Sequence, residues 1–66
     1  PFQRNLRIQF TEEGNFEIGD ALGRIIYSGT AQQGENQLNT EHWPVGVYWL
    51  RYTEGGSFKT QKIIKQ

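Results

Sequence analysis

Apolar and polar residues alternate along several short stretches of this chain. The alternation is clearest over residues 6–10, where Leu6, Ile8 and Phe10 are separated by polar side chains, and it returns over residues 16–18. A period of two is typical of a strand that buries one face. The pattern therefore predicts two strands here, with a turn over the polar segment 12–15.

The next stretch combines a tight turn with a third strand. Asp20 and Gly23 stand at the first and fourth positions of residues 20–23, as a type I turn prefers. Residues 24–27 are rich in β-branched and aromatic side chains, which favours a strand. We expect this strand to end at Ser28 and Gly29, the polar stretch 30–35 to bridge two sheets, and residues 36–39 to form a short strand.

The strongest strand signal covers residues 46–52. Tyr48, Leu50 and Tyr52 share one face of this segment, and we expect that face to point inward. Trp49 then lies outward beside Arg51. Residues 54–56 indicate a hairpin, and residues 58–65 are expected to form the last strand.

These patterns predict an all-β protein. Six short strands with turn signals between them and no helical stretch are typical of a small antiparallel β-sandwich. The 66 residues are enough for one domain and contain no cysteine, so no disulfide can stabilise it. The core must rely on large apolar side chains, and the sequence has two tryptophans, three tyrosines and four phenylalanines.

Charge argues against nucleic-acid binding. Seven basic residues balance seven acidic ones, so the broad positive field of a nucleic-acid binder is not expected. No run of roughly 18 apolar residues occurs, so no membrane-spanning helix is expected either.

Candidate catalytic and metal-binding residues are few. His42 is the only histidine, and its neighbour Glu41 points away from it on an extended segment. Ser28 and Ser57 lack the surroundings of an activated nucleophile. The carboxylates are scattered singly, apart from an adjacent pair in the predicted turn at 12–15. We therefore predict no catalytic site, no metal site and no cofactor.

Exposed aromatic residues can stack on sugar rings or mark a partner surface. Trp43, Trp49 and Tyr52 make a carbohydrate-binding module an alternative to be tested. Burial is the simpler explanation of this cluster, because most large aromatic residues serve packing.

Three segments, in this order and spacing, resemble one family. They are Asp20-Ala21-Leu22-Gly23-Arg24 between two strands, Gly46-Val47-Tyr48-Trp49-Leu50-Arg51 after a polar stretch at 34–36, and Lys62-Ile63-Ile64-Lys65. Pro1 and residues 6–8 also match the family's opening. The chain thus resembles the C-terminal sorting domain, type A, of type IX secretion substrates in Bacteroidetes-type bacteria. Residues 1–66 are expected to form one such domain, without a few residues before Pro1 and without its upstream cargo.

The resemblance implies an immunoglobulin-like sandwich of six to seven strands that follows a larger N-terminal cargo. Its implied partners are the type IX outer-membrane translocon and the shuttle and sortase components. The implied route runs through the periplasm and the outer membrane to the cell surface or the medium, with removal by a sortase in many members. The resemblance also implies that the fold is held by family motif residues, namely Asp20, Gly23, Arg24, Gly46, Tyr48 and Leu50.

The last strand is the expected recognition element, because pairing at a sheet edge provides affinity and alternate side chains provide specificity. Lys62 and Lys65 are expected to supply charge, and Ile63 and Ile64 apolar contact. An exposed terminal strand also allows a homodimer by pairing with a second copy. The open alternatives are the carbohydrate-binding module and a purely structural spacer.

Overall fold

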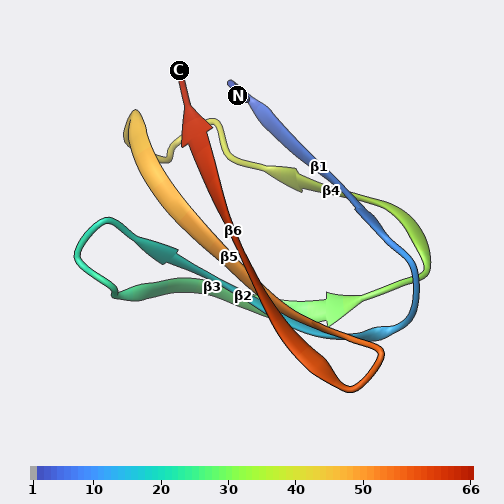
Figure 1. Cartoon of the computed structure of the whole chain (residues 1–66). Helices are drawn as coiled ribbons and strands as arrows, with labels where there is room; N and C mark the ends of the chain where they lie inside the picture. The colour runs from blue at the N-terminus through green and yellow to red at the C-terminus, as the bar shows by residue number, and fades with distance from the viewer. Residues whose placement is uncertain (1) are drawn as a thin grey trace.

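The computed structural model describes residues 2–66 and shows six strands (Figure 1). In chain order these are β1 Asn5–Phe10, β2 Gly14–Asp20, β3 Ile25–Ala31, β4 Gly34–Asn39, β5 Gly46–Glu54 and β6 Ser57–Lys65. Pro1, which matches the family's opening motif, lies outside the described residues. No helix capable of spanning a membrane occurs within residues 2–66.

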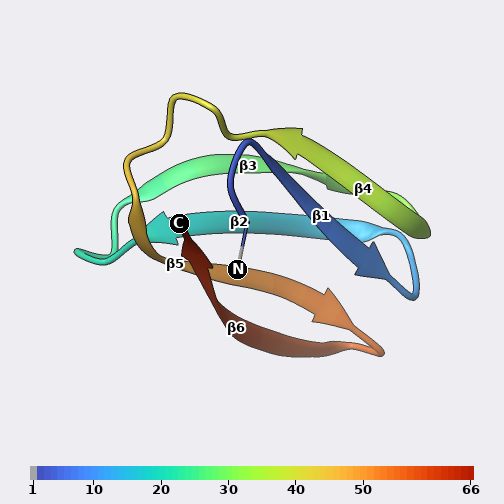
Figure 2. The same cartoon turned by 90° about the horizontal axis from the view of Figure 1, so that it is seen from above.

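The strands form two antiparallel sheets packed on each other. β1 pairs with β4, and the four-stranded sheet has the order β3-β2-β5-β6 (Figure 2). Only β2–β3 and β5–β6 are hairpins, so the chain crosses between sheets after β1, after β3 and after β4. The predicted small antiparallel β-sandwich is confirmed; that it is immunoglobulin-like stays a prediction.

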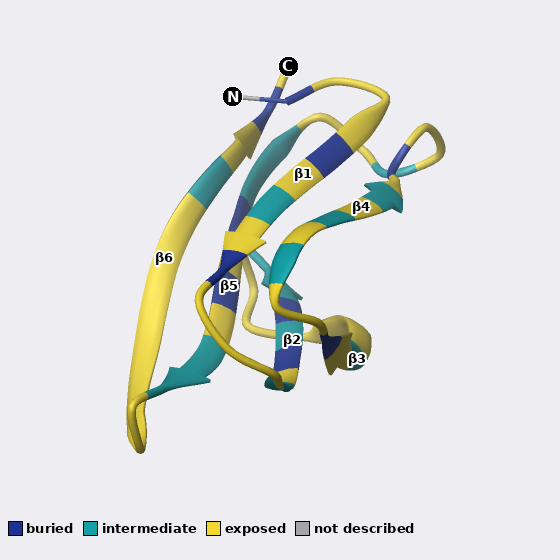
Figure 3. Ribbon diagram, turned by 90° about the vertical axis from the view of Figure 1, so that its right-hand side faces the viewer, coloured by how far each residue is buried: buried dark blue, intermediate teal, exposed yellow. Residues whose placement is uncertain are grey.

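The core lies between the two sheets, and buried positions alternate with more exposed ones along strands such as β1 and β5 (Figure 3). Phe10 of β1 joins the layers, since its ring lies 5.5 Å from Phe16 and 5.4 Å from Tyr52. Tyr48 and Leu50 are buried as predicted, and Tyr52 packs against the core from its margin. The buried apolar residues are Phe2, Leu6, Phe10, Phe16, Ile18, Ala31, Tyr48 and Leu50.

The third strand is longer than predicted. It does not end at Ser28 and Gly29 but continues to Ala31, so the connection to β4 is only residues 32–33. A Cβ atom at Gly29 would lie 3.2 Å from the Tyr27 ring and 3.3 Å from the Phe16 ring. The glycine therefore serves the close packing of two aromatic rings, and the predicted strand end at this position is wrong.

The segment after β1 is a crossover between sheets. It is tied to the β5–β6 hairpin at the far end of the molecule. Thr11 Oγ1 donates to Glu54 Oε2 at 2.8 Å, and the Gly55 N–H donates to Glu12 Oε1. Gly55 and Gly56 have φ of 59° and 79°, which is the backbone of a tight type I′ hairpin turn. This confirms the predicted hairpin.

Candidate recognition site

The three motif segments meet at one end of the four-stranded sheet. Asp20 at the end of β2 pairs with Tyr48 near the start of β5, and Tyr48 pairs with Ile63 near the end of β6. In the same way Gly46 pairs with Lys65. Segments that are 15 to 28 residues apart at these pairs thus lie on three adjacent strands. We take this end of the sheet as the candidate site.

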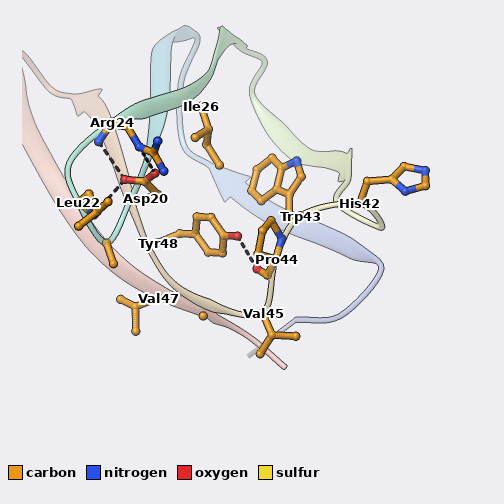
Figure 4. Close-up of a pocket in the computed structure, with 12 residues that line it drawn as sticks. Asp20, Leu22, Arg24, Ile26, His42, Trp43, Pro44, Val45, Val47 and Tyr48 are labelled. Atoms are coloured by element: carbon orange, nitrogen blue, oxygen red, sulfur yellow. Dashed lines mark hydrogen bonds and ion pairs between the residues drawn. The ribbon is translucent and has the colours of Figure 1, made fainter.

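The Asp20 side chain organises the β2–β3 turn (Figure 4). Its Oδ1 accepts the N–H groups of Leu22 and Arg24 at 2.9 Å each, and its Oδ2 accepts Arg24 Nε–H at 2.8 Å. The Gly23 N–H donates to the Asp20 carbonyl at 2.9 Å, and Gly23 has φ of 85°. The predicted tight turn is confirmed, since aspartate fixes its start and glycine accepts the left-handed backbone at its end.

Electrostatics at this turn favour the charged aspartate. Partial desolvation acts to raise the pKa of Asp20, but the hydrogen bonds from Arg24 and Leu22 and the charge of Arg24 outweigh it. The pKa of Asp20 therefore lies below its usual value.

Tyr48 anchors the loop before β5. Its hydroxyl donates to the Pro44 carbonyl, and its ring lies 5.3 Å from Trp43 and 6.3 Å from Phe2. Burial, followed by the charge of Asp20, raises the pKa of the Tyr48 hydroxyl above its usual value. The tyrosine thus joins the turn, the loop and the core.

Lys65 points into the protein and is only 6% exposed. Its ammonium group donates to the Thr40 carbonyl, to the Trp43 carbonyl at 2.7 Å and to the Glu41 carbonyl at 3.1 Å. An ammonium has three N–H donors, and each finds an acceptor on this loop. Lys65 is therefore a cross-link between β6 and the β4–β5 loop, a role that its sequence motif did not indicate.

Phe2 and Thr40 add further hydrogen bonds close to the Lys65 cross-link. The Phe2 N–H donates to the Ile64 carbonyl at 3.0 Å, and the Gln66 N–H donates to the Phe2 carbonyl at 2.8 Å. Thr40 is fully buried, and its hydroxyl donates to the Gln3 carbonyl at 3.0 Å. Sequence reasoning missed both residues, because neither lies in a periodic pattern.

The four residues of the last motif divide between two faces. Ile63 packs against the core beside Tyr48, and Lys65 is buried. Lys62 and Ile64 are exposed on the opposite face of β6, the outer face of the sheet. Of the motif, these two side chains are the exposed ones in the folded domain.

The aromatic residues of the carbohydrate-binding alternative do not share a surface. Trp43 packs against the core and lines an open depression of about 490 Å³ (Figure 4), and Tyr52 packs against the core beside Phe10. Trp49 lies on the outer face, 39% exposed, as predicted. The three rings therefore form no single stacking platform.

Chemistry-bearing side chains in the described part of the chain are dispersed. Across residues 2–66 no three His, Cys, Asp or Glu side chains gather in a group that could hold a metal ion. His42 lies on the rim of the depression with Asp20 and Arg24, which are paired with each other. The chain thus forms a small all-β module whose motif residues build one end of a sheet.

Comparison with known proteins agrees with this picture. The family model described as "Secretion system C-terminal sorting domain" matches residues 1–66, the whole chain. No curated protein and no solved structure matches it. The chain belongs to the family of secretion system C-terminal sorting domains that serve type IX secretion. Membership implies an N-terminal cargo and export to the cell surface or the medium.

Proposed function

We propose that residues 1–66 act as one folded export signal, which directs an upstream cargo from the periplasm across the outer membrane through the type IX translocon. The shuttle and sortase components are its further partners, and a sortase at the cell surface removes the domain after translocation. In this proposal the domain has no catalytic activity, binds no cofactor and no nucleic acid, and functions through its surface alone.

One observation supports a folded signal most directly. The buried Lys65 ammonium binds three carbonyls of the β4–β5 loop, so the last motif takes its shape only when the domain has folded. A linear peptide carrying the same four residues would not reproduce the division of Lys62 and Ile64 from Ile63 and Lys65. The export machinery is therefore expected to bind the folded sandwich.

The experiment uses a fluorescent reporter with a signal peptide, fused to the chain and expressed in a bacterium with a type IX system. Deletion of residues 62–66 should leave the reporter folded in the periplasm, because both the Lys65 cross-link and the exposed Lys62 and Ile64 side chains are lost. A structural spacer would tolerate this deletion. Reporter that accumulates normally in the medium after the deletion contradicts the proposal.

A homodimer through an exposed edge strand is a separate prediction. The edges of the large sheet are β3 and β6. The terminal strand β6, on which the sequence-based expectation rests, carries Lys59 and Lys62, which oppose self-pairing, and Phe2 already pairs with its end at Lys65. Ile25–Ala31 of β3 carries no charge, so we place the dimer contact on that edge instead. Sedimentation of the chain should show a dimer that Ser28→Lys converts to monomer. A monomeric wild type at high concentration contradicts this prediction.

A further inference from the structure

The outer face of the four-stranded sheet carries an apolar patch that no part of residues 2–66 covers. The β1–β4 sheet packs on the opposite, inner face. On the outer side, Val47 lies directly opposite Ile64, and Trp49 lies directly opposite Lys62. Trp49 is 39% exposed and Ile64 is 42% exposed. We call Val47, Trp49, Lys62 and Ile64 the outer patch.

The outer patch borders a shallow hollow in the surface. Gly19 lies between Ile25 and Trp49 in the sheet register, and the missing side chain leaves a shallow hollow lined by these residues. Ile25 is 55% exposed at its edge. A rigid tryptophan beside a hollow is the kind of feature that carries binding energy in protein interfaces.

The charges around the patch leave one cation without a partner. Arg51 pairs with Glu17 at 3.4 Å, and Arg24 pairs with Asp20 at 2.8 Å. Lys62 makes no ion pair within the described residues, although it lies directly opposite Trp49 within the patch. The patch therefore presents one uncompensated positive charge among apolar side chains.

We propose that the outer patch docks on a protein that offers an apolar surface with a carboxylate opposite Lys62. The proposal rests on the proposed function and names the contact through which the export machinery binds the domain. Burial of Trp49, Val47 and Ile64 supplies affinity, and the Lys62–carboxylate pair fixes the orientation. Ile63 and Lys65 take no part in the contact, because they hold the fold from inside.

A protein fits this patch better than a membrane surface does. Docking to an anionic bilayer typically uses roughly four to eight clustered basic residues. The outer patch has a single free lysine, and its neighbour Arg51 is already paired with Glu17. One defined carboxylate is the simplest complement to one defined ammonium.

Matched variants test the proposal in the reporter fusion. Lys62→Glu and Trp49→Ser should each reduce export by about tenfold or more, the effect of losing one interface hot spot. Lys62→Arg should keep export. Lys59→Glu makes the same charge change on the same strand but on its other face, and Phe58→Ser removes an exposed ring at the far end of β6. Both controls should be exported like the wild type.

Stability, the pattern of export among the variants, and vesicle binding together distinguish failure of the proposed function from failure of the outer-patch proposal. Urea unfolding of each variant chain must show wild-type stability, so that an export defect reports docking. If the wild-type fusion is not exported at all, the proposed function fails; if the wild type, Lys62→Glu and Trp49→Ser are all exported equally, only the outer-patch proposal fails. Binding of the chain to phosphatidylglycerol vesicles that Trp49→Ser abolishes would assign the patch to a membrane and overturn the proposal.

Discussion

The Lys65 ammonium donates a 2.7 Å hydrogen bond to the Trp43 carbonyl and thereby joins the last strand to the loop that precedes β5. Two more carbonyls of that loop, those of Thr40 and Glu41, accept its other hydrogens. A buried ammonium with all donors satisfied stabilises the fold, whereas its removal takes this donor away from the part-buried Glu41 and Trp43 carbonyls.

The first prediction concerns the Lys65 cross-link to the β4–β5 loop. Lys65→Met should lower the free energy of unfolding by about 2–4 kcal/mol, because the apolar chain can fill the space but cannot donate. The exposed Lys62→Met should change it by no more than about 0.5 kcal/mol. Urea unfolding followed by tryptophan fluorescence measures the free energy of unfolding of both variants. Equal stabilities of Lys65→Met and Lys62→Met would contradict a stabilising role of the Lys65 cross-link.

Gly46 provides the second prediction. Its φ of 151° lies where side-chain-bearing residues rarely occur, although no atom lies within 4 Å of an added Cβ. Gly46→Val should therefore destabilise the domain by about 1–3 kcal/mol through backbone strain alone. Gly19→Ala, at a strand glycine without positive φ, is the matched control and should cost less. A Gly46→Val domain as stable as the wild type would show that the backbone can relax.

The third prediction uses the lowered pKa of Asp20. A carboxyl group whose folded pKa is depressed contributes stability that is present above its unfolded value of 3.8 and is lost as the pH falls through the folded pKa. Chemical unfolding from about pH 6 to about pH 2 should show this acid loss, and Asp20→Asn should reduce it. An unchanged acid profile in the variant would assign the loss to other carboxylates.

Tyr48 gives the converse prediction at high pH. Its pKa is raised above 10.0, so its contribution is complete below pH 10.0 and is lost as the pH rises further. Tyr48→Phe should abolish this alkaline loss. At neutral pH the substitution should lower the free energy of unfolding by about 1 kcal/mol, because the hydrogen bond to the Pro44 carbonyl is removed. The measurement is the free energy of unfolding of the wild type and of Tyr48→Phe as the pH rises above 10.0. Parallel profiles of the two proteins would contradict the prediction.

The alternation of apolar and polar residues and the turn residues predicted most of the fold. Individual residues show the physical reasons. Alternation placed Leu50 inside and Trp49 outside, since a pleated strand allows no other arrangement once one face is buried. The Asp20–Gly23 turn was predictable because its hydrogen bonds form between near neighbours. Gly29 was mistaken for a strand end, because the aromatic rings that require a glycine there come from packing and only one of them is close in sequence.

The candidate site was predictable only as a set of segments. Their meeting at one end of the sheet depends on the β2–β5 pairing, which no local signal encodes. No local pattern distinguished the exposed Lys62 from the buried Lys65. The difference between a free cation and a buried cross-link arises from the β4–β5 loop, whose carbonyls turn toward β6 only in the folded chain.

The most direct test of the account is the location of a reporter fused to this chain in a wild-type type IX host and in a translocon mutant. The account predicts reporter outside the wild-type cell and in the periplasm of the mutant. Folded reporter held in the periplasm of both strains would contradict the sorting function.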